Sequence, residues 1–345
     1  MYFIKIINIK NFLYLLFFIL NLSSSIANAT AEQLQFKQYV LDNGLKILLK
    51  QNNNNPIVIL QLWYKSAQNN IYKLIQDQDI ELIKQALFMK GANSTTFTPK
   101  DHIAYSHIMP ASELELGLNL ESKKMIHWHG PNNATLIIAG NININKTYAL
   151  IKKYFANIAS NNKNIEFKIH NQEHKSYKTI SQLLIKYKVP SLNTATENWE
   201  PFAIKILTNI LNKYLINNNI ISNVSYDIFD NSWSKVEILT LLNTQDLITI
   251  ENIKQLIMHN INNLKLNVIS KQELTKIKQE ILDLYRYEQS DLFNQVYLAG
   301  SLNMAGYHPN LLIQQLEEIN DITPKQIQMV AKKYFIKENL TINNL

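Results

Sequence analysis

One segment of the chain has the spacing of a zinc site: His170-Asn171-Gln172-Glu173-His174. On a helix, two histidines four positions apart share a side and can bind one zinc ion, and a glutamate between them can act as a general base. The segment lies in a polar stretch rich in Asn, Lys and His. Two interpretations of His170, Glu173 and His174 are therefore open: a zinc site, or a chance match to the motif in a polar linker. The hydrophilic flanks favour the chance match.

The other paired histidines carry weaker signals. His102 and His107 lie five positions apart on a predicted strand, so we expect them on opposite faces, as ordinary strand residues. His127 and His129 would share a face if that segment were extended, which allows a two-ligand clamp, although a structural role is favoured. The chain has no cysteine, so any zinc site must use His and carboxylate ligands.

The first half of the chain alternates strand and helix patterns. Asp42-Asn43-Gly44 joins two β-prone runs and predicts a hairpin. Apolar periodicity and breakers predict the remaining elements: strands at 57–64, 97–108 and 134–139, and helices at 71–89, 111–125 and 145–155.

The second half repeats this theme after a polar linker at 159–178. We expect a strand at 180–189, a helix at 199–215, strands at 220–229 and 235–242, and several helices from 249 to 334. A local echo supports duplication. The same pattern occurs twice: a helix end, a turn and a strand that begins near Asn-x-Thr. It lies at residues 127–129 with 132–136, and again at residues 332–335 with 338–342.

The N-terminus predicts export. Lys5 and Lys10 precede an apolar run, and Ala27-Asn28-Ala29 supplies a small-x-small cleavage pattern, so residues 1–29 are expected to be a signal peptide. Removing its two lysines lowers the net charge from +7 to +5. The remaining lysines are dispersed, which does not favour nucleic-acid binding. No later stretch is long and apolar enough to predict a membrane span.

Several short segments, in chain order, resemble the pitrilysin/insulinase family of zinc metallopeptidases. They are Leu41-Asp42-Asn43-Gly44-Leu45, Gln61-Leu62-Trp63-Tyr64-Lys65, Phe88-Met89-Lys90-Gly91-Ala92, Phe97-Thr98-Pro99-Lys100-Asp101 and Asn132-Asn133-Ala134-Thr135-Leu136. The resemblance covers residues 36–157 well and 178–345 more loosely. It implies an α+β fold of two homologous halves, each a mainly antiparallel sheet covered on one face by helices, with the first half truncated.

The resemblance also implies domain bounds and an active-site position. The bounds are a first domain at 30–158 with an internal deletion near 126–130, the linker at 159–178, and a second domain at 179–345. Active members bind zinc through His-x-x-Glu-His and a later Glu. Aligned on Lys90-Gly91, the motif positions hold Leu82, Gln85 and Ala86. Leu and Ala cannot bind zinc, and Gln cannot act as a base near neutral pH.

We therefore expect no catalytic residues, no metal and no cofactor in a degenerate, periplasmic pseudo-peptidase. In the second half, Tyr226 is the one remnant of the family's substrate-steering residues, although a role as a strand aromatic is favoured. The leading hypothesis is a non-catalytic subunit that partners an active zinc peptidase of the family or binds peptides. The alternatives are an active zinc endopeptidase with a displaced site at His170, Glu173 and His174, and a decayed gene product.

Overall fold

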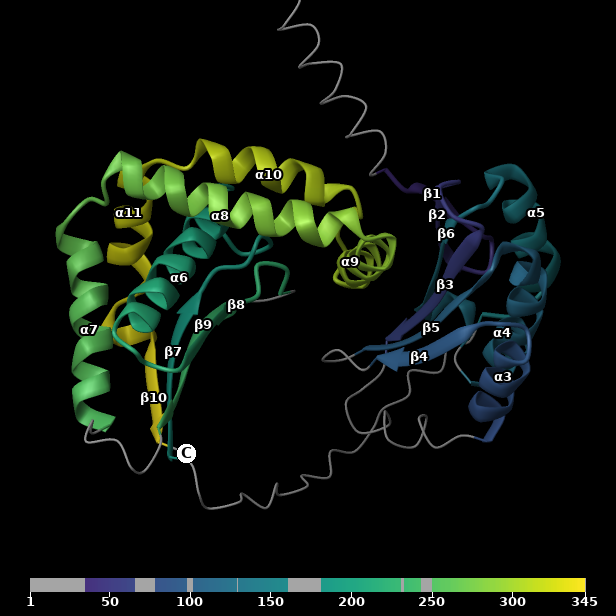
Figure 1. The fold of residues 1–345 in the computed structure, drawn as a ribbon, viewed down its shortest axis with the longest axis horizontal. Helices are drawn as coiled ribbons and strands as arrows, with labels where there is room; N and C mark the ends of the chain where they lie inside the picture. Colours follow the sequence, from purple (N-terminus) through teal and green to yellow (C-terminus); the bar gives the residue numbers. More distant parts are fainter. Residues whose placement is uncertain are drawn as a thin grey trace, which may run out of the picture.

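The chain forms two sheets, each with its own helices (Figure 1). The computed structural model describes residues 35–65, 78–97, 102–128, 130–160, 181–230, 233–242 and 250–344. We call residues 35–160 the first half and residues 181–344 the second half. Every helix in the described ranges is too short or too polar to cross a bilayer.

The first half is built on a six-stranded sheet of order β1-β2-β6-β3-β5-β4. Its strands are β1 (Lys37–Val40), β2 (Lys46–Gln51), β3 (Ile57–Lys65), β4 (Asn93–Phe97), β5 (His102–Pro110) and β6 (Ala134–Gly140). Only β2 and β6 pair in parallel. The strand predicted at 97–108 is wrong in extent. The chain forms two antiparallel strands there, because Phe97 of β4 pairs with Ala104 of β5.

Three helices cover one face of this sheet: α3 (Gln78–Phe88), α4 (Leu114–Trp128) and α5 (Ile144–Phe155) (Figure 1). The 3-10 turns η1 (Ala111–Glu113) and η2 (Pro131–Asn133) precede α4 and β6. The N-cap Asn143 accepts a hydrogen bond from the Lys146 backbone, which starts α5. The predicted helix at 71–89 is described from Gln78 onward, and residues 71–77 lie outside the described ranges.

The second half is built on an antiparallel sheet of order β10-β7-β9-β8. Its strands are β7 (Ser181–Val189), β8 (Ser222–Tyr226), β9 (Ser234–Leu242) and β10 (Leu340–Asn344). Its helices are α6 (Glu200–Asn217), α7 (Ile250–Leu266), α8 (Lys271–Ser290), α9 (Leu292–Met304), α10 (Leu311–Asp321) and α11 (Pro324–Tyr334), followed by the turn η3 (Lys337–Asn339).

The two halves share a four-stranded plan. The run β6-β3-β5-β4 of the first sheet corresponds to β10-β7-β9-β8 of the second, and every neighbouring pair in both runs is antiparallel. The predicted echo is confirmed: α4, η2 and β6 match α11, η3 and β10 in order and in sheet position. The α+β fold of two related halves is therefore the observed one.

The cores follow from strand alternation. In β3, all residues from Val58 to Tyr64 are buried, so both faces of the first sheet are covered. One apolar cluster lies between this sheet and helices α3, α4 and α5, and a second cluster lies on its opposite face. In the second half, the apolar cluster lies on the helix-covered face of the sheet. The first sheet therefore has a covering layer that the predicted one-sided design lacks.

Candidate functional site

Four polar side chains meet inside the first half, between the sheet and α4. The His107 ring contacts Ser94 Oγ through Nδ1 and Glu121 Oε1 through Nε2, each at 2.8 Å. Lys124 Nζ lies 2.6 Å from Glu121 Oε2 and 3.4 Å from the centroid of the Tyr105 ring. His107, Glu121 and Lys124 are all buried. The cluster is closed to solvent, and it fastens α4 to β4 and β5.

The charges in this cluster balance each other. Burial raises the pKa of the Glu121 carboxyl, but the Lys124 charge and the hydrogen bond with His107 lower it more, to about 2. Glu121 is therefore ionised at neutral pH and offsets the buried charge of Lys124. Burial raises the pKa of the neighbouring Tyr64 phenol well above its usual value, and the Glu121 charge adds to this effect. The arrangement suits a fixed structural contact.

The separation of His102 from His107 is confirmed. His107 lies on the helix-covered face of β5 with Tyr105, whereas His102 shares the opposite face with Ala104. The clamp considered for His127 and His129 required an extended segment. The backbone at His127 instead belongs to α4, which runs to Trp128. His129 lies outside the described residues, so the pair itself is not tested.

The three motif positions inferred from the resemblance lie on α3. Leu82 is 61% exposed, and Gln85 and Ala86 are also exposed, while the following residue, Leu87, is buried in the core. They therefore occupy the side of α3 that faces away from the sheet. His170, Glu173 and His174 lie outside the described residues. Within the described ranges, no three His, Cys, Asp or Glu side chains gather closely enough to hold a metal ion.

Tyr226 lies at the end of β8 on the helix-covered face of the second sheet. Its hydroxyl donates a 2.6 Å hydrogen bond to the Pro190 carbonyl, and the side chain is buried. Burial raises the pKa of this phenol, and the nearby Asp227 adds to the effect. Its hydrogen-bonding group is thus occupied by the chain's own backbone.

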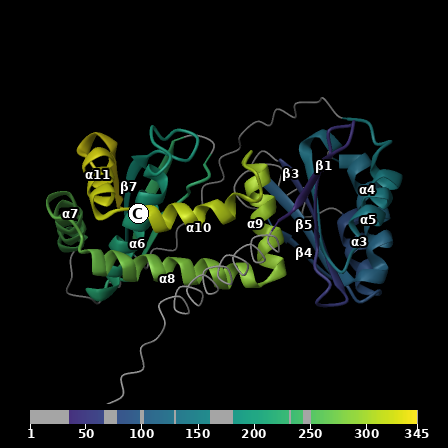
Figure 2. The same cartoon turned by 90° about the horizontal axis from the view of Figure 1, so that it is seen from above.

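The inward face of the first sheet, which looks toward the second half, is occupied by helix α9 (Figure 1). From above, α9 lies between the first sheet and the rest of the second half (Figure 2). Val296, Ala299 and Met304 of α9 pack against a set of buried side chains from the strands. That set is Leu48, Ile59, Trp63, Ala104, Ile137 and Ala139. Helix α9 of the same chain therefore covers the inward face of the first sheet.

The fold and these contacts can be set beside known proteins. The family model for the peptidase M16 inactive domain matches residues 125–281. No curated protein matches the chain in sequence. M16 is the pitrilysin/insulinase family, so the match agrees with the resemblance read from the segments above.

Solved structures share the fold over most of the chain. A protease from Helicobacter pylori has a TM-score of 0.72 at 15% identity, over 89% of this chain and 98% of its own. A chain of Complex III2 from Candida albicans has a TM-score of 0.66 at 12% identity, over 89% and 95% of the two chains. The chain therefore has the fold of M16-type peptidases.

The periplasmic protease PqqL from Escherichia coli is about twice as long as this chain. The chain matches the first half of PqqL with a TM-score of 0.60 at 12% identity, covering 90% of this chain and 91% of that half. Against full-length PqqL, the TM-score is 0.62 at 13% identity, with 90% of this chain and 47% of PqqL covered. At such identities, the likeness concerns the fold alone.

Polar contacts also join the two halves of the chain. Lys50 Nζ donates to Gln295 Oε1 at 2.6 Å, and Thr135 Oγ1 donates to Asn303 Oδ1 at 2.9 Å. Lys50 is buried and faces the ring of Phe36 at 5.4 Å from its centroid. Burial lowers the pKa of this lysine to about 8. At this contact between the two halves, the buried ammonium group of Lys50 has one polar partner among the described residues, the neutral side-chain amide of Gln295.

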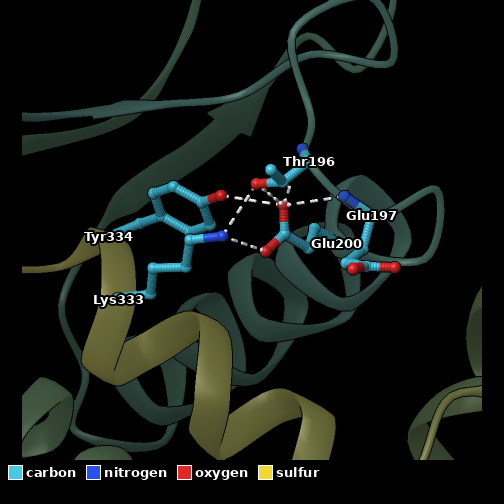
Figure 3. Close-up of polar contacts among 5 residues, drawn as sticks. All are labelled: Thr196, Glu197, Glu200, Lys333 and Tyr334. Atoms are coloured by element: carbon cyan, nitrogen blue, oxygen red, sulfur yellow. Dashed lines mark hydrogen bonds and ion pairs between the residues drawn. The ribbon is translucent and has the colours of Figure 1, made fainter.

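A second polar cluster fixes the helix layer of the second half (Figure 3). Glu200, at the start of α6, accepts hydrogen bonds from Lys333 Nζ at 2.6 Å and from the Tyr334 hydroxyl at 2.8 Å. The backbone and hydroxyl of Thr196 and the backbone of Glu197 also donate to it. Burial raises the pKa of Glu200, but the bonds from Lys333 and Tyr334 lower it more. This carboxylate holds the end of α11, just before β10, against α6.

Sequence patterns indicate these contacts only in part. Lys-Lys-Tyr-Phe occurs twice, at 152–155 and 332–335, and each copy places a Lys and a Tyr on a glutamate: Glu115 in the first half and Glu200 in the second. The copies are not equivalent in topology, because α5 follows β6 whereas α11 precedes β10. The docking of α9 had one weak signal, the glycine at position 300 within an apolar helix.

Proposed function

We propose that this chain is a non-catalytic M16-type subunit that pairs with an active zinc peptidase of the same family and helps to enclose peptides. The observation that carries the proposal is the occupancy of the aligned motif positions on α3. Leu82 and Ala86 offer zinc no donor atom, and Gln85 offers no carboxylate to take a proton from water. All three are exposed on the outer side of α3, away from the sheet.

The likeness to larger or multi-chain M16 structures supports the pairing. The chain covers 91% of the first half of PqqL and 47% of the whole protein, so PqqL is about twice as long as this chain. The chain of Complex III2 that shares this fold is itself part of a multi-subunit assembly.

The N-terminal pattern supports a periplasmic location. Lys5, Lys10 and the apolar run before Ala27-Asn28-Ala29 fit a cleaved signal peptide. We therefore place the subunit and its partner in the same exported compartment. N-terminal sequencing of the protein recovered from the envelope tests this placement, with a new terminus expected at Thr30.

Three measurements test the function. The full chain, isolated gently from its native envelope, should co-purify with a relative that carries an intact His-x-x-Glu-His motif. Alone, it should contain no stoichiometric zinc and should not cleave unfolded peptides. Recovery of monomer only, under conditions that preserve other envelope complexes, would contradict the pairing.

Zinc analysis separates this proposal from an active enzyme. Stoichiometric zinc that is lost in His170→Ala or His174→Ala, together with peptide cleavage that a chelator abolishes, would establish a displaced catalytic site instead. A control variant, His308→Ala, removes an exposed histidine of the second half and should change neither readout. Aggregation of the exported chain without a cooperative thermal transition would favour a decayed gene product.

A further inference from the structure

The two inward sheet faces differ in what covers them. On the first sheet, α9 buries the inward side chains of β3, β5 and β6. On the second sheet, the apolar cluster lies wholly on the helix-covered side. The inward side chains of its strands remain half-buried or exposed, as Leu184, Leu239 and Leu241 show. Within the described ranges, no helix packs on this face as α9 does on the first sheet.

The open face is cationic at one end. Lys188 of β7 and Lys235 of β9 are direct cross-strand partners, and both are exposed. Two residues away on each strand, by contrast, Lys186 and Glu237 are cross-strand partners and form an ion pair, with 2.9 Å between Lys186 Nζ and Glu237 Oε1. No described carboxylate forms an ion pair with Lys188 or Lys235. Like charges directly opposite each other destabilise a sheet, so this pair favours an anionic group from outside.

An aromatic ring adjoins the lysine pair. Lys188 Nζ lies 5.1 Å from the centroid of the Trp233 ring, which is 44% exposed. The ring also contacts Tyr334 edge-on, at 6.4 Å between centroids, so it is held in place next to the Glu200 cluster of Figure 3. A flat, partly exposed indole beside two lysines offers apolar contact together with positive charge.

We infer that the inward face of the second sheet binds an acidic, extended peptide segment, with carboxylates placed at Lys188 and Lys235. This inference rests on the proposed function and names the chemical class of its peptide. An apolar helix like α9 does not suit this face, because it would bury Lys186 and Glu237 together with the lysine pair. An extended acidic segment leaves these groups partly hydrated and supplies the charge that the lysine pair lacks.

The test is fluorescence anisotropy of labelled peptides on the full chain. Three peptides of equal length carry Glu, Gln or Lys at the same positions. The acidic peptide should bind tightest, and added salt should weaken it. In Lys188→Gln/Lys235→Gln, binding of the acidic peptide should fall about tenfold, since two exposed charge pairs are lost, while the Gln peptide should bind as before.

The matched control is Lys123→Gln/Lys146→Gln, which removes the same charge from exposed positions of the first half. It should keep the full preference for the acidic peptide. No variant should melt below the wild type, because the four lysines are exposed, and Lys188→Gln/Lys235→Gln should melt at the same temperature or slightly higher, because it relieves a like-charge pair. Equal losses in both double variants, or an acidic preference that survives Lys188→Gln/Lys235→Gln, would overturn the inference. So would an oligonucleotide that displaces the acidic peptide at lower concentration than unlabelled peptide does.

The outcomes separate the inference from the proposed function. If the acidic peptide binds through the two lysines but no peptidase co-purifies, the peptide site is supported and the pairing with a peptidase is refuted. If a peptidase co-purifies but the chain shows no preference for the acidic peptide, the pairing is supported and the peptide site is refuted.

Discussion

Gly300 of α9 lies directly against the indole ring of Trp63 on β3. A Cβ atom at position 300 would come within 2.4 Å of Trp63 Cε2 and 2.5 Å of its Nε1. The ring cannot retreat easily, because it is fully buried and its Nε1 donates to Gln61 at 2.9 Å. The closeness of the two halves at this point therefore depends on the absence of a side chain.

Gly300→Ala should destabilise the chain by about 1–3 kcal/mol, because the added methyl overpacks a rigid contact. This sign is opposite to the gain of about 1 kcal/mol that Ala brings in an exposed helix interior. Chemical denaturation followed by circular dichroism measures the difference. Ser301→Ala, on the exposed side of the same helix, is the control and should be near neutral. Unchanged stability in Gly300→Ala would mean that α9 does not dock as described.

The buried Glu121 should make stability depend on acid. Its pKa is about 2 in the folded chain, against 4.5 when unperturbed. A depressed carboxyl pKa contributes stability above pH 4.5, and this contribution, about 3 kcal/mol, is lost as the pH falls from 4.5 to 2. Denaturation at a series of pH values measures the slope.

Two variants at this cluster sharpen that measurement. Glu121→Gln should cost about 3–5 kcal/mol at pH 7, because it leaves Lys124 buried without a counter-charge. Glu121→Gln/Lys124→Met removes both charges and should recover much of that loss, with a shallower acid slope than the wild type. A double variant that is no more stable than Glu121→Gln would show that the charge balance is not the cause.

Lys50 should also make stability rise with pH, but in the alkaline range. Its pKa is about 8 in the folded chain and 10.5 when unperturbed, so the folded chain releases this proton first. The unfolded chain then binds more protons, and stability should rise between pH 8 and 10.5 by about 1–3 kcal/mol from this group. Lys50→Met should lack this rise, whereas Lys46→Met, exposed on the same strand, should retain it. Parallel pH profiles for wild type and Lys50→Met would refute the buried cation.

Glu200 and Glu115 offer a matched comparison of the same Lys–Tyr contact. Glu200→Gln should cost about 1–3 kcal/mol, because the buried carboxylate accepts charge-assisted bonds from Lys333 and Tyr334. Glu115→Gln should cost little, since Glu115 and Lys153 are largely exposed. Thermal melts of both variants measure the contrast. A larger loss in Glu115→Gln would contradict the role assigned to burial.

Local patterns explain which predictions held. The hairpin turn at Asp42-Asn43-Gly44, the opposite faces of His102 and His107, and the echo ahead of β6 and β10 all follow from spacing within one segment. The strand expected at 97–108 was wrong in extent, because β4 ends at Phe97 and β5 begins at His102. The extended segment that a clamp at His127 and His129 required is not found at His127, because α4 continues through Trp128.

The sequence by itself determined the family resemblance, the two-part α+β design and the residue types at the motif positions, because each resides in neighbouring residues with a fixed periodicity. Only the tertiary structure decided that α9 covers the first sheet, that Glu121 meets both His107 and Lys124, and that Lys188 faces Lys235. The physical reason is that these contacts depend on how distant segments pack. Strand register and the close approach at Gly300 set them, and neither leaves a periodic mark in the sequence.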